Sequence, residues 1–153
     1  LTVWEHVEFI SRAYQLQDWR ERAEALLDRM ELTDKKEKLG QELSKGMQQK
    51  LSLCCALLPQ PKVIMLDEPL VGLDPHAIKE LKTMLTELRD QGCAVLVSTH
   101  MLDSVAEFWD KALIMKSGKI MAIRTRAEIE ESGENLEQLF FSITENGDGG
   151  TTE

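Results

Sequence analysis

The chain has 153 residues, of which 42% are hydrophobic, and a formal net charge of −9 at pH 7. This acidic balance argues against nonspecific binding to nucleic acid, because the phosphate backbone attracts basic surfaces. No apolar run approaches the roughly 18 residues of a membrane-spanning helix. The first residues indicate a helix start instead of a signal peptide. The three cysteines lack metal-ligand spacing and fit reduced thiols in the cytosol.

The N-terminal part of the sequence predicts two amphipathic helices. A T-x-x-E capping sequence at Thr2 begins the first helix, over residues 2–14, and a D-x-x-E sequence at Asp18 begins the second, over residues 18–30. The charged residues 33–38 are expected to form a short solvated helix. The side chains predicted to face inward are Val3, Val7, Ile10 and Tyr14 in the first helix and Trp19, Ala23, Leu26, Leu27 and Met30 in the second.

A third helix begins with a polar, glycine-containing turn. Ser44 is well placed as its N-cap, and Pro59 stops it. The free backbone N–H groups and positive dipole end of such a helix can bind an anion. Gly46 would let a phosphate approach the backbone closely, and Lys45 adds a cation; an ordinary capped core helix is the alternative. The apolar positions at helical spacing are Met47, Leu51, Cys54 and Leu58.

Two adjacent carboxylates follow an apolar run. The run from Val63 to Leu66 has the length of a buried strand, and Asp67 and Glu68 come directly after it. In open α/β sheets, ligands bind at the carboxyl ends of the strands. One acid can hold a magnesium ion and the other can activate a water, as nucleotide hydrolysis requires. Taken alone, the pair also fits a strand that ends in a polar turn.

The next segments complete a predicted β-α-β unit. Asp74 can cap a helix over residues 75–91. Residues 93–100 have the pattern of a second buried strand, which ends at His100. Because a right-handed β-α-β unit places the two carboxyl ends side by side, we expect His100 to share the crevice with Glu68. A structural role for this histidine is the alternative.

The C-terminal part predicts a hairpin and two short helices. The hairpin pairs residues 111–116 with 119–124 about Ser117-Gly118, a capping box at Thr125 begins one helix, and the other spans residues 135–142. The predicted organisation is a helical subdomain at residues 1–60, an α/β core part at 61–125, C-terminal helices at 126–145 and a disordered tail at 146–153.

Four segments together resemble, in the same order, the motifs of the ATP-binding domain of an ABC transporter. The segment Leu43-Ser44-Lys45-Gly46-Met47-Gln48 resembles the signature motif, residues 63–68 resemble the Walker B motif, residues 72–75 the D-loop and residues 98–100 the H-loop. Four motifs in the family's order make a specific match, which covers all but the last few residues. The resemblance implies an α/β fold, part of a RecA-like P-loop NTPase domain with an N-terminal helical subdomain.

Two features depart from the family's pattern. The usual signature is L-S-G-G-Q, whereas this sequence has Lys45 and Met47 at the third and fifth positions. A K-G-M version resembles the ATPase subunits of ABC-2-type exporters. The 153 residues contain no G-x-x-x-x-G-K-[ST] P-loop, or Walker A motif, which supplies most of the phosphate cradle. We therefore expect the C-terminal portion of a larger domain, which alone neither binds ATP tightly nor hydrolyses it.

The resemblance also implies roles for individual residues. Two such domains would sandwich two ATP molecules head to tail. Asp67 would help to hold Mg²⁺, Glu68 would orient and polarise the attacking water, and His100 would contact the γ-phosphate. Asp74 would link the two ATP sites. The signature residues expected to lie at the ATP of the partner domain are Ser44, Lys45, Gly46, Met47 and Gln48.

The resemblance implies partners as well. A second ATP-binding domain and a transmembrane permease subunit are expected, with the chain in the cytoplasm at the inner face of the cell membrane and without nucleic acid. Two alternatives stay open at this point. One is a soluble ABC-type ATPase, and the other is a truncated, non-enzymatic subunit that docks on a membrane partner through residues 2–30.

Overall fold

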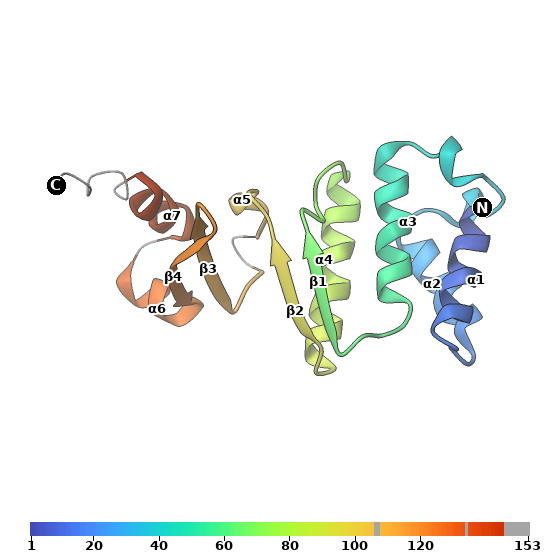
Figure 1. The fold of residues 1–153 in the computed structure, drawn as a ribbon, viewed down its shortest axis with the longest axis horizontal. Helices are drawn as coiled ribbons and strands as arrows, with labels where there is room; N and C mark the ends of the chain where they lie inside the picture. Colours follow the sequence, from blue (N-terminus) through green and yellow to red (C-terminus); the bar gives the residue numbers. More distant parts are fainter. Residues whose placement is uncertain (106–107, 134, 146–153) are drawn as a thin grey trace. The chain divides into compact units, whose positions relative to one another are not determined.

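The computed structural model describes residues 1–105, 108–133 and 135–145 (Figure 1), which belong to two compact units, Leu1–Thr99 and His100–Glu153. The predicted disordered tail at 146–153 lies outside the described residues, and the predicted divisions at residues 60 and 125 stay predictions. None of the described helices combines the length and hydrophobicity needed to cross a membrane.

The first unit contains α1 (Val3–Ala13), α2 (Trp19–Arg29), 3-10 turns at Thr33–Lys35 and Gly40–Glu42, α3 (Lys45–Leu57), β1 (Val63–Asp67), α4 (Pro75–Asp90) and β2 (Ala94–Ser98). The second unit contains α5 (Leu102–Val105), β3 (Lys111–Lys116), β4 (Lys119–Thr125), α6 (Arg126–Ser132) and α7 (Leu136–Glu145).

Short-range hydrogen bonds begin the helices of the first unit. The Thr2 hydroxyl accepts from the Glu5 amide at 3.1 Å, and the Glu5 carboxylate accepts from the Thr2 amide at 2.8 Å, so the capping box is confirmed. Asp74 caps α4 by accepting from the Ala77 amide at 2.9 Å. The predicted cap at Asp18 is wrong. An N-cap needs an extended backbone, whereas Asp18 is left-handed, with φ at +49°, and its side chain makes no capping hydrogen bond.

Helices α1, α2 and α3 form the helical part of the first unit (Figure 1). The prediction that Tyr14 faces inward is wrong, since Tyr14 is 64% exposed. Helix α1 ends at Ala13, and Ser11 takes the buried position one turn after Val7, where its hydroxyl donates to the Val7 carbonyl at 2.8 Å. The buried hydrophobic residues of this part are Val3, Val7, Trp19, Ala23, Leu27, Met30, Leu32, Leu43, Leu51, Leu53, Cys54, Leu57 and Leu58.

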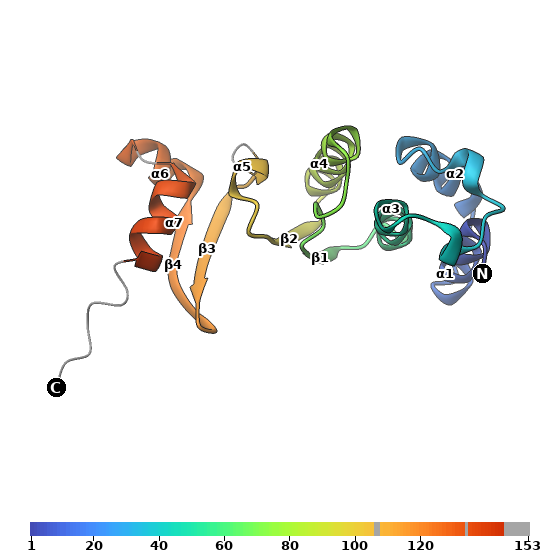
Figure 2. The same ribbon diagram turned by 90° about the horizontal axis from the view of Figure 1, so that it is seen from above.

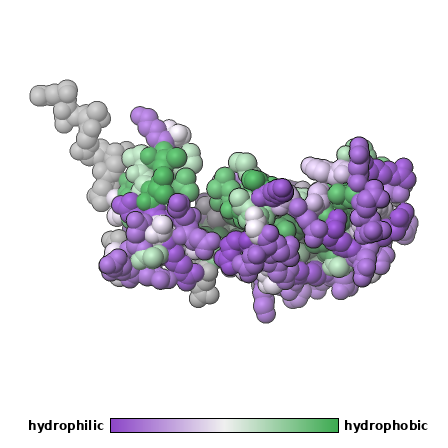
Figure 3. Space-filling model, turned by 90° about the horizontal axis from the view of Figure 1, so that it is seen from below, coloured by the Kyte–Doolittle hydropathy of each residue, from purple (hydrophilic) through white to green (hydrophobic). Residues whose placement is uncertain are grey.

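The parallel pairing of β1 with β2 confirms the predicted β-α-β unit. Helix α4 lies on one side of the two strands (Figure 2), where Ile64 is buried. The prediction that both strands are buried is wrong on the other side, where Val63, Met65 and Leu96 are 62%, 72% and 48% exposed. Successive side chains of a strand point to opposite faces, and in the first unit no described residue covers this second face. Figure 3 shows hydrophobic surface over β1 and β2.

The second unit contains the predicted hairpin and helices. Strands β3 and β4 pair antiparallel, and Ser117 and Gly118 connect them with φ at +50° and +75°. These signs match a type I′ hairpin turn. Thr125 caps α6 through the predicted capping box. Helix α7 extends to Glu145, three residues beyond the predicted end at 142. The unit has its own small core of Ile114, Ile129 and Leu139.

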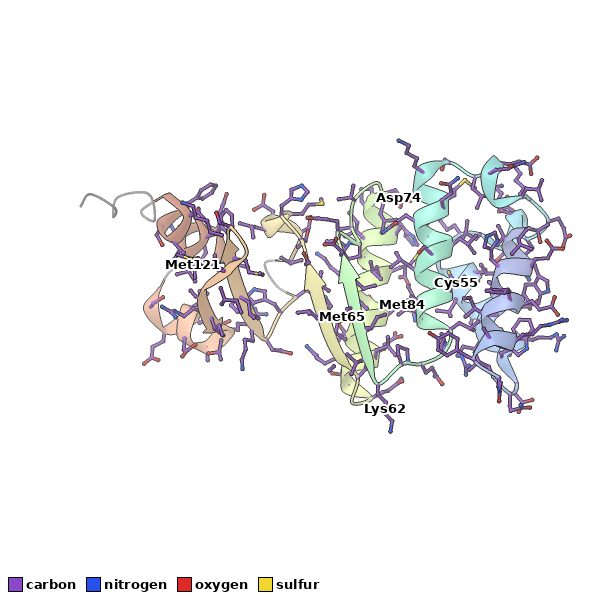
Figure 4. All side chains as sticks on the ribbon, viewed as in Figure 1. Cys55, Lys62, Met65, Asp74, Met84 and Met121 are labelled. Carbon is purple, nitrogen blue, oxygen red and sulfur yellow. The ribbon has the colours of Figure 1, made fainter. Side chains whose placement is uncertain are left out.

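The buried thiol of Cys54 allows the packing of the helical core to be tested. Burial raises its pKa from 9.0 to about 12, because the thiolate is disfavoured away from water, and burial raises the pKa of Cys55 (labelled in Figure 4) to about 11. At pH 8 we therefore expect about a thousandfold less Cys54 thiolate than in the unfolded chain. Maleimide labelling followed by peptide mass mapping should show Cys54 protected in buffer and modified in urea. Rapid labelling in buffer would contradict this core.

Candidate functional site

The predicted carboxylates lie at the paired ends of β1 and β2. Asp67 is opposite Ser98 in the strand register and is exposed. The Glu68 amide donates to the Ser98 carbonyl at 2.8 Å, and the Thr99 hydroxyl donates to Glu68 Oε2 at 2.9 Å. The two strand ends therefore hold the half-buried Glu68 at both its backbone and its side chain.

The backbone of Glu68 is left-handed, with φ at +46°. Residues other than glycine adopt this region at a cost of about 1–3 kcal/mol, and such residues are found preferentially at functional sites. The hydrogen bonds of Glu68 with Ser98 and Thr99 help to hold this conformation. The conformation supports a functional role for the carboxylate.

The predicted histidine follows Thr99 directly in the chain. His100 is the first residue of the second unit, and its carbonyl accepts from the Leu102 amide at 3.1 Å. Its approach to Glu68 stays a prediction. Thr99 contacts the Glu68 carboxylate through its hydroxyl group. Thr99 lies in the H-loop segment at residues 98–100, and this position is its sequence signal.

The start of α3 has the form of an anion site. Ser44 is the N-cap, as predicted, and its hydroxyl accepts from the Met47 amide at 3.3 Å. The first amides of a helix, here those of Lys45 and Gly46, have no acceptor within the helix. Ser44 and Lys45 are exposed. Gln48 braces this turn, since its side-chain amide donates to the carbonyls of Gly40 and Leu43 at 3.0 and 3.2 Å.

Gly46 has an internal role that its sequence position does not reveal. A Cβ atom at Gly46 would lie 2.6 Å from the carbonyl oxygen of Gly72, in the loop that follows β1. This distance is shorter than any van der Waals contact allows. The absence of a side chain therefore lets α3 and the loop at Gly72 touch.

We expect Gly46→Ala to destabilise the first unit. In an exposed helix position the same change gains about 1 kcal/mol, but here the added methyl meets backbone and must push α3 away from Gly72. Urea denaturation should give a lower free energy of unfolding than for the unsubstituted chain. Ser52→Ala, on the exposed face of the same helix, is the control and should be neutral or slightly stabilising. A more stable Gly46→Ala chain would show that the contact is absent.

Lys50 is a buried residue, 7% exposed, that the sequence pattern does not predict as part of the site. Its ammonium group contacts Asp74 Oδ2 at 2.7 Å and Glu31 Oε2 at 3.2 Å. Burial by itself would lower the pKa of Lys50, but the hydrogen bonds to Asp74 and Glu31 outweigh burial and raise it. Lys50 lies one turn after Gly46 and one turn before Cys54, on the face of α3 that is buried. This helical spacing is the sequence signal that could indicate the burial of Lys50.

Asp74 uses both carboxylate oxygens within the chain. One oxygen caps α4 and the other binds Lys50 (Figure 4 shows Asp74 between α4 and α3). The Lys50 ammonium and then the Ala77 amide lower the pKa of Asp74 from 3.8 to about 2. Since the folded pKa is depressed, the pair stabilises the fold above pH 3.8, and this contribution is lost as the pH falls through about 2.

Comparison with known proteins identifies the family. A family model described as ABC transporter matches residues 1–71. YthP of Bacillus subtilis, an uncharacterized ABC transporter ATP-binding protein, is 32% identical over 151 residues, which cover 95% of this chain and 64% of YthP. This chain is part of an ABC-type ATP-binding domain. EcsA of the same organism, an ABC-type transporter ATP-binding protein, is 32% identical, and the match covers 97% of this chain and 63% of EcsA.

Solved structures agree with this assignment. A structure of an ATP binding subunit of an ABC transporter matches with a TM-score of 0.88 and 32% identity, over 94% of this chain and 62% of that chain. The cbiO1 protein of Clostridium perfringens, part of the ABC transporter complex cbiONQ, matches with a TM-score of 0.66 and 27% identity, over 95% of this chain and 59% of that chain. The fold expected from the four motifs is confirmed. The 153-residue chain, called the ABC segment below, thus spans about three fifths of the length of these proteins.

Proposed function

We propose that this ABC segment supplies the hydrolytic carboxylate and the signature helix of a transporter ATPase subunit. The observation that carries the proposal is the arrangement at Glu68. Its carboxylate lies at the carboxyl end of a parallel strand pair, is held by Thr99 and has a strained backbone. Ligands of open α/β sheets bind at this edge.

Glu68 is the proposed general base. The Thr99 hydroxyl donates to Oε2 of Glu68, and the carboxylate would orient and polarise the water that attacks the γ-phosphate of ATP. Positioning and charge stabilisation are the main sources of rate in phosphoryl transfer. His100 would contact the γ-phosphate beside this water.

Asp67 is the proposed ligand for Mg²⁺. Its carboxylate is exposed at the end of β1, directly before Glu68. Magnesium is usually held by one or two carboxylates together with phosphate oxygens and water, so this donor fits the ion. Bound Mg²⁺ would neutralise charge that develops on the phosphate oxygens.

The start of α3 is the proposed phosphate contact of a second domain. Ser44 and Lys45 are exposed at this helix start, and the amides of Lys45 and Gly46 would bind the phosphate oxygens, with Met47 and Gln48 completing the signature segment. In a head-to-tail pair this site would meet the ATP of the partner domain, and Asp74 would link the two sites. A membrane permease, of the ABC-2 exporter kind that the K-G-M signature resembles, would be the third component, at the cytoplasmic face of the membrane.

Nucleotide titration tests the proposal. Isothermal titration with MgATP and a phosphate-release assay would compare the isolated chain with a complete ATP-binding domain that contains it. We expect hydrolysis from the complete domain, and neither tight binding nor turnover from the isolated chain, because it has no P-loop. A complete domain that does not hydrolyse ATP would refute the proposed function. Turnover by the isolated chain would refute its dependence on a P-loop.

A further inference from the structure

Lys50 is a buried cation that the proposed chemistry does not use. Its side chain is 9% exposed, whereas those of its partners Asp74 and Glu31 are 45% and 60% exposed. Burial of a lone ammonium is costly, so the two carboxylates hold it in place. Three separate segments meet at the Lys50 ammonium group: α3, the loop before α4 and the turn at Glu31 that follows α2.

A second contact joins two of these segments, α3 and the loop before α4. A Cβ atom at Gly46 would lie 2.6 Å from the carbonyl oxygen of Gly72. Gly46 and Lys50 are one helical turn apart, so they present the same side of α3 to the loop at residues 72–74. The loop is therefore attached to α3 at both of its ends, by close packing at Gly72 and by the ion pair at Asp74.

We propose that Lys50 is a positioning residue that fixes the loop at residues 72–74 against the first turns of α3. The first amides of α3 and the carboxylate of Glu68 would then keep a constant distance and orientation. For its catalytic consequence the inference rests on the proposed function. In a head-to-tail pair, α3 would act on the partner's ATP and Glu68 on the chain's own, so Lys50 would connect the two nucleotides through one chain.

The chemistry of a buried ion pair separates this role from simple stabilisation. Desolvation cancels much of the attraction between buried charges, so replacing a buried charge by an apolar group of similar volume is often neutral for stability when its partner reaches water. Asp74 is nearly half exposed and reaches water. Lys50→Met keeps most of the packed stem and removes only the charge. This variant should stay folded but lose the attachment of Asp74.

Amide hydrogen exchange on the isolated chain tests the attachment directly. In Lys50→Met we expect the amides of residues 71–74, 76 and 77 to exchange about tenfold faster, because an ordinary charged hydrogen bond is worth about that factor. Lys50→Arg, which keeps the charge, should restore slow exchange. Arg29→Met is the matched control, since Arg29 joins α2 to α4 through Glu80 and Glu87 but does not touch the loop. Unchanged exchange in Lys50→Met, or equal acceleration in the control, would overturn the proposal.

Steady-state kinetics in the complete domain test the consequence. Lys50→Met should lower kcat for ATP hydrolysis by about 10- to 100-fold, as expected for a small misplacement of reacting groups. Lys50→Arg should recover most of the rate, and Arg29→Met should keep it. Loss of rate by Arg29→Met to the same extent, or a normal rate in Lys50→Met, would overturn the catalytic consequence. If the unsubstituted domain has no activity, the proposed function fails, and the exchange rates still decide whether Lys50 fixes the loop.

Discussion

Glu68→Gln in a complete ATP-binding domain is expected to lower kcat for ATP hydrolysis by about two to four orders of magnitude. The amide has the shape of the carboxylate and can still accept the hydrogen bond that Thr99 donates to Glu68. It cannot accept a proton from water, so nucleotide should bind while turnover stops. Phosphate release and equilibrium binding of MgATP would be measured on the same preparation.

The matched control for this substitution is Glu87→Gln. Glu87 lies on α4 and pairs with Arg29 at 2.7 Å, away from the carboxyl ends of the strands. We expect it to leave hydrolysis unchanged, because exposed ion pairs contribute little. A Glu68→Gln domain with normal turnover, or an equal loss in Glu87→Gln, would remove Glu68 as the base.

Met84→Ala should destabilise the isolated chain by about 2–5 kcal/mol, the usual cost of deleting a buried methionine side chain. Met84 is 3% exposed on α4, whereas Met65 is 72% exposed on β1 (both labelled in Figure 4). Met65→Ala is therefore the control and should change stability by less than about 0.5 kcal/mol. Urea denaturation followed by circular dichroism measures both. Equal losses would mean that the outer face of β1 is covered in solution.

Local chemistry explains which parts of the fold the sequence predicted. The caps at Thr2, Ser44 and Asp74 depend on hydrogen bonds that span three residues, so a short pattern contains all the necessary information. The exception at Asp18 depends on the path of the chain before it, which turns through a left-handed conformation. A T-x-x-E or D-x-x-E pattern cannot reveal such a path.

Long-range contacts explain what the sequence did not predict. An apolar strand such as β1 indicates hydrophobic surroundings, but which faces are covered depends on elements distant in the sequence. The ion pairs of Lys50 span 19 residues to Glu31 and 24 to Asp74 (74 − 50). A lysine is polar in any hydrophobicity pattern, so its burial was invisible. The motif predicts phosphate binding at Gly46, whereas the contact of Gly46 with Gly72 depends on the three-dimensional arrangement.

The uncovered side of β1 and β2 has a practical consequence for anyone who handles the isolated chain. This side is an exposed hydrophobic strip, made of Val63, Met65 and Leu96, on a sheet of only two strands. Two-stranded sheets are only marginally stable by themselves. Such a strip binds other copies of the same chain and chaperones. Soluble yield should therefore fall as the concentration rises, and mild detergent should recover it.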